Sequence, residues 1–128
     1  MRLIHFIESG YFFETKGRIA VGTSETRDRF QQLVSWLCEC IRQDPEPIMR
    51  GGKMLILWEP IGSVRLCMAQ DLRAEILIQF PQMEIEVRQA TEYMLRHWIQ
   101  NQAYGILKDD DLLEEARETG VRYLIGIF

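Results

Sequence analysis

Residues 53–80 read KMLILWEPIGSVRLCMAQDLRAEILIQF, and the fold class depends on how this stretch is divided. Residues 53–58 are apolar on both faces, which is typical of a central strand. A short proline- and glycine-containing segment then breaks the strand. Residues 64–68 and 74–80 both alternate between polar and apolar side chains, so we interpret them as two strands joined by a hairpin at residues 69–73.

The sequence before this stretch predicts short antiparallel strands and then a long helix. β-Branched and aromatic pieces between residues 3 and 21 alternate with turn residues, which predicts two or three strands. Thr23 or Ser24 is a candidate N-cap for the helix that follows. The helix carries one apolar stripe, made of Phe30, Leu33, Val34, Leu37, Cys38 and Ile41. Pro45 ends the helix.

The sequence after residue 80 predicts two further helices and a final strand. Pro81 stands at the start of the first of these helices, which ends at Gly105. Its inner stripe has helical spacing and consists of Met83, Val87, Ala90, Met94 and Trp98. Asp111 with Glu114 three residues later predicts the start of a short third helix, and Gly120 predicts its end. Residues 121–128 are mostly apolar and predict a strand.

These elements predict one α+β domain spanning residues 1–128. We expect a mostly antiparallel sheet of about five to six strands, with the helices packed chiefly on one face. The chain has 128 residues, of which 47% are hydrophobic and 27% charged, as in an ordinary globular protein. No apolar stretch approaches the roughly 20 residues of a membrane span, and no export signal is recognisable, so we expect a cytoplasmic protein.

The net charge of −4 comes from one local feature. Residues 109–118 read DDDLLEEARE and hold six acids against one base, whereas the rest of the chain has 13 acids and 14 bases. We expect this acidic segment to contact the basic surface of a partner protein, through Asp109, Asp110, Asp111, Glu114 and Glu115. Acids in a first helical turn also complement the helix dipole, which is the structural alternative.

A second contact surface is predicted from aromatic and mixed-polarity residues. Trp36 lies off the main apolar stripe of the long helix, and tryptophan often anchors interfaces. The outer face of the helix expected after Pro81 presents Glu92, Arg96 and Ile99. We expect these residues to form the contact surface with a partner or with a second copy.

The candidate reactive residues do not form a recognisable catalytic or metal motif. The cysteines at 38 and 40 are too closely spaced for a zinc pair and lie within a helix, and the third is Cys67. His5 and His97 could meet a cysteine only through the fold. Consecutive aspartates without a calcium-loop pattern do not converge on one ion. We therefore expect no metal, no cofactor and no catalysis.

The sequence thus predicts a small cytoplasmic protein–protein interaction module, which binds either a second copy of itself or another protein. Inhibitor or immunity proteins, secretion chaperones and phage or mobile-element accessory proteins belong to this class. One alternative is a ligand-binding protein or enzyme, with a pocket between the sheet and the helix after Pro81 lined by Trp98, His97, Tyr93 and Cys67. The other alternative is a nucleic-acid-associated regulator, for which the chain offers no recognised motif.

Overall fold

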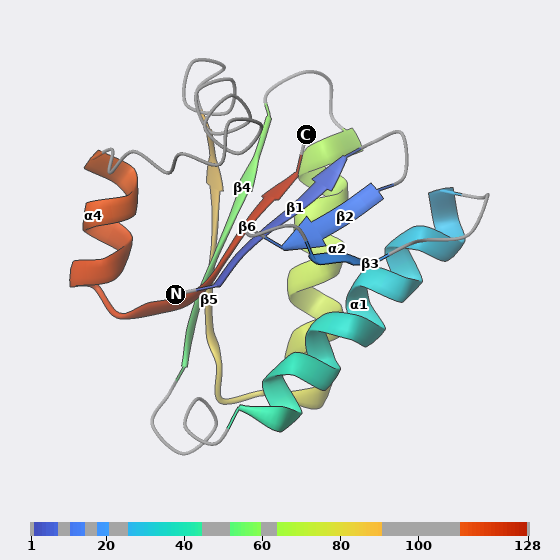
Figure 1. Cartoon of the computed structure of the whole chain (residues 1–128), viewed down its shortest axis with the longest axis horizontal. Helices are drawn as coiled ribbons and strands as arrows, with labels where there is room; N and C mark the ends of the chain where they lie inside the picture. The colour runs from blue at the N-terminus through green and yellow to red at the C-terminus, as the bar shows by residue number, and fades with distance from the viewer. Residues whose placement is uncertain are drawn as a thin grey trace.

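The computed structural model describes residues 2–7, 11–14, 18–20, 26–44, 52–59, 64–90 and 111–127. In this part of the chain, six strands form one sheet in the order β3-β2-β1-β6-β4-β5 (Figure 1). The strands are β1 (Arg2–Ile7), β2 (Tyr11–Glu14), β3 (Arg18–Ala20), β4 (Lys53–Trp58), β5 (Glu84–Gln89) and β6 (Val121–Ile127). The helices are α1 (Thr26–Gln43), α2 (Val64–Gln79) and α4 (Asp111–Glu118).

The prediction of a mostly antiparallel sheet is wrong. The four strands β1, β6, β4 and β5 run parallel to one another, and in the described part of the chain only the pairs β1–β2 and β2–β3 are antiparallel. A parallel pair needs a crossover connection rather than a hairpin. That crossover is α2, which carries the chain from the end of β4 back to the start of β5.

The stretch from residue 64 to 79 is a helix and not the predicted hairpin. Its buried residues are Ala69, Leu72 and Ile76, and Phe80 follows at the same helical spacing. Leucine, alanine, arginine, glutamate and methionine dominate the segment, and all of them favour helix. No glycine, asparagine or proline stands where the hairpin would have turned, so the helical period prevails over the short polar–apolar alternation.

Residues 84–89 form a strand and not the predicted helix. Pro81 occupies the second position of a tight turn in which the Met83 amide donates to the Phe80 carbonyl at 3.1 Å. Polar and apolar residues then alternate from Glu84 to Arg88, with Ile85 buried between exposed Glu84 and Glu86. The remainder of the predicted helix, from residue 91 to Gly105, lies outside the described residues.

Three other elements are confirmed. α1 buries its predicted stripe from Leu33 to Ile41, and it ends at Gln43 as the prolines require. α4 begins at Asp111 and ends before Gly120, whose φ of 80° is the left-handed conformation of a helix C-terminal residue. β6 is buried from Tyr123 to Ile127, and it lies in the middle of the sheet.

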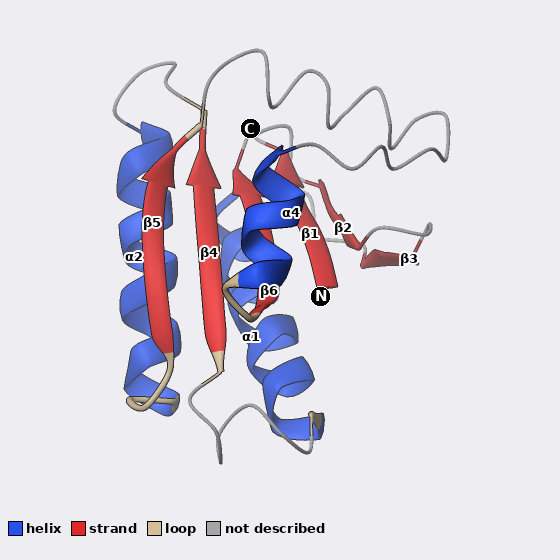
Figure 2. Cartoon of the chain, turned by 90° about the vertical axis from the view of Figure 1, so that its left-hand side faces the viewer, coloured by secondary structure: helices blue, strands red, loops and turns tan. Residues whose placement is uncertain are grey.

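The described helices lie mainly on one face of the sheet, as expected, but one helix covers the other face. α1 and α2 lie side by side on one face and enclose the main core with β1, β4, β5 and β6. α4 lies on the opposite face, against β6 (Figure 2). The sheet therefore ends in β5 on one side and in the short β3 on the other.

Candidate functional site

The outer edge of β5 presents main-chain groups to its surroundings. The Glu84 amide donates to the Gly52 carbonyl at 3.1 Å, and the Ala90 amide donates to the Trp58 carbonyl at 3.0 Å, so both amides point toward β4. In a parallel strand, alternate residues direct both main-chain groups to the same side. The amides and carbonyls of Ile85, Val87 and Gln89 therefore point away from the sheet.

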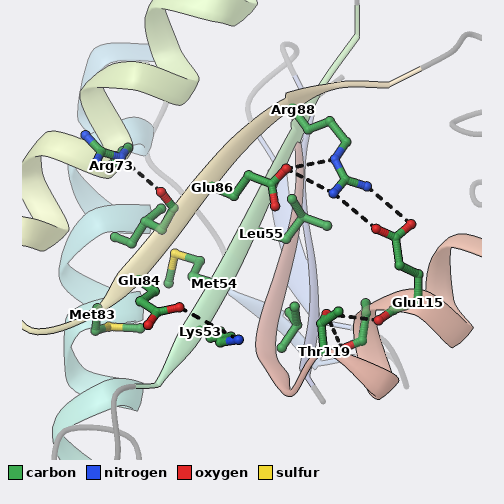
Figure 3. A pocket seen from close by; sticks show the side chains of 13 residues that line it. Lys53, Met54, Leu55, Arg73, Met83, Glu84, Glu86, Arg88, Glu115 and Thr119 are labelled. Atoms are coloured by element: carbon green, nitrogen blue, oxygen red, sulfur yellow. Dashed lines mark hydrogen bonds and ion pairs between the residues drawn. The ribbon is translucent and has the colours of Figure 1, made fainter.

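Arg73 of α2 reaches this edge. Its Nε donates to the Ile85 carbonyl at 3.1 Å, and the two groups face each other in Figure 3. Among the described residues, no other hydrogen bond to the outward-pointing main-chain groups of Ile85, Val87 and Gln89 is found. The edge beyond Ile85 thus offers the amides and carbonyls of Val87 and Gln89 for pairing with another strand.

One side of α2 runs along the same edge. The helical positions that flank Arg73 on this side are Leu66, Gln70 and Leu77, and both leucines are only partly buried. The opposite side of α2 turns toward α1, where Gln79 accepts a hydrogen bond from Arg42 at 2.7 Å. The β5 edge is therefore bordered by a helix face with incompletely buried apolar side chains.

The solvent-facing side of α2 carries the two large apolar side chains that are most exposed among the described residues. Val64 is 59% exposed and Ile78 is 76% exposed. Cys67 and Ala74 lie on the same helical face and are also exposed. Scattered apolar side chains are normal on a protein surface. Exposure of these side chains alone therefore does not indicate a binding site.

A pocket of about 470 Å³ lies where β4, β5 and β6 begin, next to α4 (Figure 3). All of its charged side chains except Arg73, which bonds the Ile85 carbonyl, are paired with one another. Lys53 lies 3.8 Å from Glu84, and Arg88 bonds both Glu86 and Glu115. Apolar side chains also line the pocket, among them Met54, Leu55, Met83, Ile85, Ala116 and Val121.

Arg88 connects the edge strand to α4. Its Nη2 lies 3.2 Å from Glu115 and 2.9 Å from Glu86. The hydrogen bond to Glu115 is the main reason that the pKa of Arg88 is raised above its ordinary value, and Glu86 adds to the effect. Arg88 therefore presents a permanent positive charge beside the edge.

The predicted partner-binding residues divide into described and undescribed ones. Glu114 and Glu115 are exposed on α4, and Glu115 is engaged with Arg88. Trp36 is partly buried against the core, and the Arg2 guanidinium lies 5.7 Å from the centre of its ring. Asp111 is the first residue of α4. Outside the described residues lie Asp109, Asp110, Glu92, Arg96 and Ile99.

The predicted ligand pocket is not assembled by the described residues. Cys67 is exposed on α2, while Trp98, His97 and Tyr93 lie outside the described residues. The pocket beside α4 is lined by other residues, which the sequence does not reveal when residues 84–89 are interpreted as a helix. The polar–apolar alternation of residues 84–88 is the pattern that indicates a strand here.

The described cysteines and His5 do not form a reactive pair. Cys38 and Cys40 are buried on α1, and burial raises the pKa of the Cys38 thiol. His5 alternates along β1 with Ile4 and Phe6, which pack in the core under α1. Its buried side chain therefore points to the other face of the sheet, away from both thiols. In the described ranges, no three His, Cys, Asp or Glu residues gather as metal ligands.

No protein-family model matches the chain, and no significant similarity was found to a curated protein or to a solved structure. Within the described part of the chain, no helix has the length and apolar character needed to cross a bilayer.

Proposed function

We propose that this chain is a protein–protein interaction module that receives an extended segment of a partner at the outer edge of β5. The observation that carries the proposal is the six-residue edge strand, whose outward groups at Val87 and Gln89 meet no hydrogen-bonding partner among the described residues. Strand addition at such an edge gives affinity through main-chain hydrogen bonds. The half-buried leucines of α2 beside the edge would gain burial in the complex.

The class of function is the one expected from the sequence, but the proposed surface is different. The carboxylates of Glu86 and Glu115 bind Arg88 within the chain, so Glu115 serves to join α4 to β5. The contact of residues 109–118 with a basic partner stays a prediction. We place the module in the cytoplasm because none of its three cysteines forms a disulfide.

The test uses a proline placed at an outward-pointing amide. Val87→Pro removes that donor and sets ring carbons on the edge, while the hydrogen bonds to β4 remain. Val87→Ala is the matched control, because it removes side-chain packing and keeps the amide. A protein captured by the wild-type chain from extract of its own cells is purified and titrated against both variants.

We expect the wild-type chain and Val87→Ala to bind this purified protein and Val87→Pro to lose binding. Equal binding by the two variants would contradict the proposal. The same holds if the chain captures no protein and does not associate with itself at high concentration. Circular dichroism of both variants establishes that the comparison is made on folded protein.

The pocket near α4 favours a second candidate function, binding of a small molecule. A volume of about 470 Å³ lies within the range of ligand pockets. Its six charged side chains are three cations and three carboxylates, which suits a neutral or zwitterionic ligand better than a phosphate. A metabolite screen by thermal shift tests this function. A ligand whose stabilising effect is abolished by Leu55→Trp supports it, and a screen without any shift counts against it.

A further inference from the structure

We infer that the partner at the β5 edge is a second copy of this chain, joined by antiparallel pairing of β5 with β5 about a two-fold axis. The inference rests on the proposed function, since it names the occupant of the same edge. A two-fold interface must be self-complementary, because each residue meets its counterpart by symmetry. The sequence EIEVRQ of β5 has this property in one register.

The outward-pointing groups determine which registers are possible. Ile85, Val87 and Gln89 direct their amides and carbonyls outward, so they must form the hydrogen-bonded pairs of the new ladder. With the axis at Val87, that residue pairs with its own copy, and Ile85 pairs with Gln89 of the second copy. Glu86 then stands directly opposite Arg88 of the second copy, and the contact occurs twice.

Neighbouring registers place like charges together. Moving the axis to Glu86 sets two glutamates opposite each other, and moving it to Arg88 sets two arginines opposite each other. Opposite charges that face each other across an antiparallel pair are stabilising, and like charges are destabilising. Glu86 and Arg88 occupy the non-hydrogen-bonded positions, where facing side chains are closest. The register centred on Glu86 also sets Glu84 opposite Arg88 of the second copy, but it keeps two glutamates facing each other at the axis. Only the register centred on Val87 pairs opposite charges without a like-charge contact, so the charges favour it.

The same axis brings the two copies of α2 into contact. α2 packs mainly on β4 and β5 and less on β6, so we infer that its axis lies about half a strand spacing inside the edge. With strands ~4.8 Å apart, the two copies of α2 would lie about 10 Å apart, which is an ordinary packing distance for helices. Antiparallel packing sets Leu66 opposite Leu77 of the second copy, and Gln70 opposite Arg73. The partly buried leucines would then be covered.

Arg73 does not prevent this arrangement. It occupies one lone pair of the Ile85 carbonyl, and a carbonyl oxygen has a second lone pair for the amide of Gln89 from the other copy. In the isolated chain, Arg73 satisfies one outward group and limits uncontrolled strand addition, as charged residues do at sheet edges. Symmetric pairing closes the interface after two copies, since each copy then uses its β5 edge.

The experiment exchanges the charges across the axis. E86R and R88E each create two like-charge contacts in the symmetric dimer. The double variant E86R/R88E restores opposite charges, and a mixture of the two single variants restores them in a heterodimer. R42E is the matched control, because Arg42 lies exposed on α1 and pairs with Glu39. Association is measured by sedimentation equilibrium, and thermal unfolding is recorded for every variant because R88E also loses its bond to Glu115.

We expect wild type and R42E to dimerise alike, and each single charge reversal to weaken dimerisation by about tenfold or more. The double variant and the mixture should regain it. A wild-type chain that stays monomeric at about 100 μM, or a mixture that forms no heterodimer, would overturn the inference. If the chain is monomeric while Val87→Pro abolishes binding of a captured protein, only the occupant is wrong. If Val87→Pro abolishes nothing, the proposed function is wrong as well.

Discussion

At the scale of single residues, Asp44 holds the end of α1 to the centre of the sheet. Arg122 donates to both oxygens of its carboxylate at 2.9 Å, and the Tyr123 hydroxyl donates to Oδ2 at 3.0 Å. Two consecutive residues of β6 reach the same carboxylate because the β4–β6 register shifts between Lys53 and Met54. Such a bulge re-aims a side chain that would otherwise point to the opposite face.

Removal of the Asp44 carboxylate should therefore destabilise the fold. Asp44→Ala leaves the buried Tyr123 hydroxyl without its acceptor, and we expect the free energy of unfolding to fall by about 2 kcal/mol. Asp44→Asn keeps an acceptor oxygen and should lose less. Urea unfolding of the three proteins measures the difference. A loss below ~0.5 kcal/mol for Asp44→Ala would show that the contact contributes little.

The same contact predicts a loss of stability at alkaline pH. Burial, and then the hydrogen bond to Asp44, raise the pKa of Tyr123 above its ordinary value of 10.0. The folded chain therefore keeps this proton at a pH where the unfolded chain has released it. The stabilisation is complete below pH ~10 and is lost as the pH rises toward the folded-state pKa. Unfolding measured from pH ~8 to ~11 should show a steeper decline for wild type than for Tyr123→Phe; equal slopes would count against it.

At the scale of elements, the sequence predicts those segments whose pattern has a single reading. The α1 stripe from Leu33 to Ile41 has only a helical period, and the prolines after it define its end. The prediction of a hairpin in place of α2 is wrong because residues 64–68 and 74–80 also alternate between polar and apolar side chains over short windows. The helical period of Ala69, Leu72 and Ile76, in contrast, extends through the predicted turn at residues 69–73. Tertiary burial of that longer stripe decides the outcome.

The prediction of a helix in place of β5 is wrong because a helical spacing prevails in the sequence over a short strand pattern. Met83 and Val87 match a helical spacing with residues beyond the strand, and Pro81 suits a helix start as well as a turn. The parallel sheet was nevertheless visible in β4, since a strand that is apolar on both faces is typical of a parallel sheet. A hairpin at residues 64–80 would instead require antiparallel strands, so the two patterns conflict in the sequence.

A glycine substitution in the middle of α2 distinguishes a helix from a hairpin at residues 64–79. Asp71 is exposed in the middle of α2, where glycine costs about 1 kcal/mol relative to alanine. In a hairpin turn at residues 69–73, glycine would be favourable instead. We expect Asp71→Gly to be less stable than Asp71→Ala by about that amount in chemical unfolding. Equal stability, or a more stable glycine variant, would contradict a helix at this position.

At the scale of the whole molecule, the candidate site depends on strand order, which a single sequence does not carry. Arg88 and Glu86 are near in sequence, but Glu115 joins them only because α4 packs beside the central strands. Likewise, Arg73 reaches Ile85 only because β5 is the outermost strand and α2 covers it. Composition alone defines the acidic segment, whereas the position of β5 at the edge of the sheet depends on the strand order.

The most direct measurement is amide hydrogen exchange in β5, read residue by residue by NMR at low and high protein concentration. The Glu86 and Arg88 amides point toward β4 and should be protected at both concentrations. The Val87 and Gln89 amides should exchange rapidly in dilute solution and become protected as the concentration rises. Rapid exchange of Val87 and Gln89 at every concentration, with the chain associated or with a captured protein bound, would contradict the assignment of the β5 edge as the interaction surface.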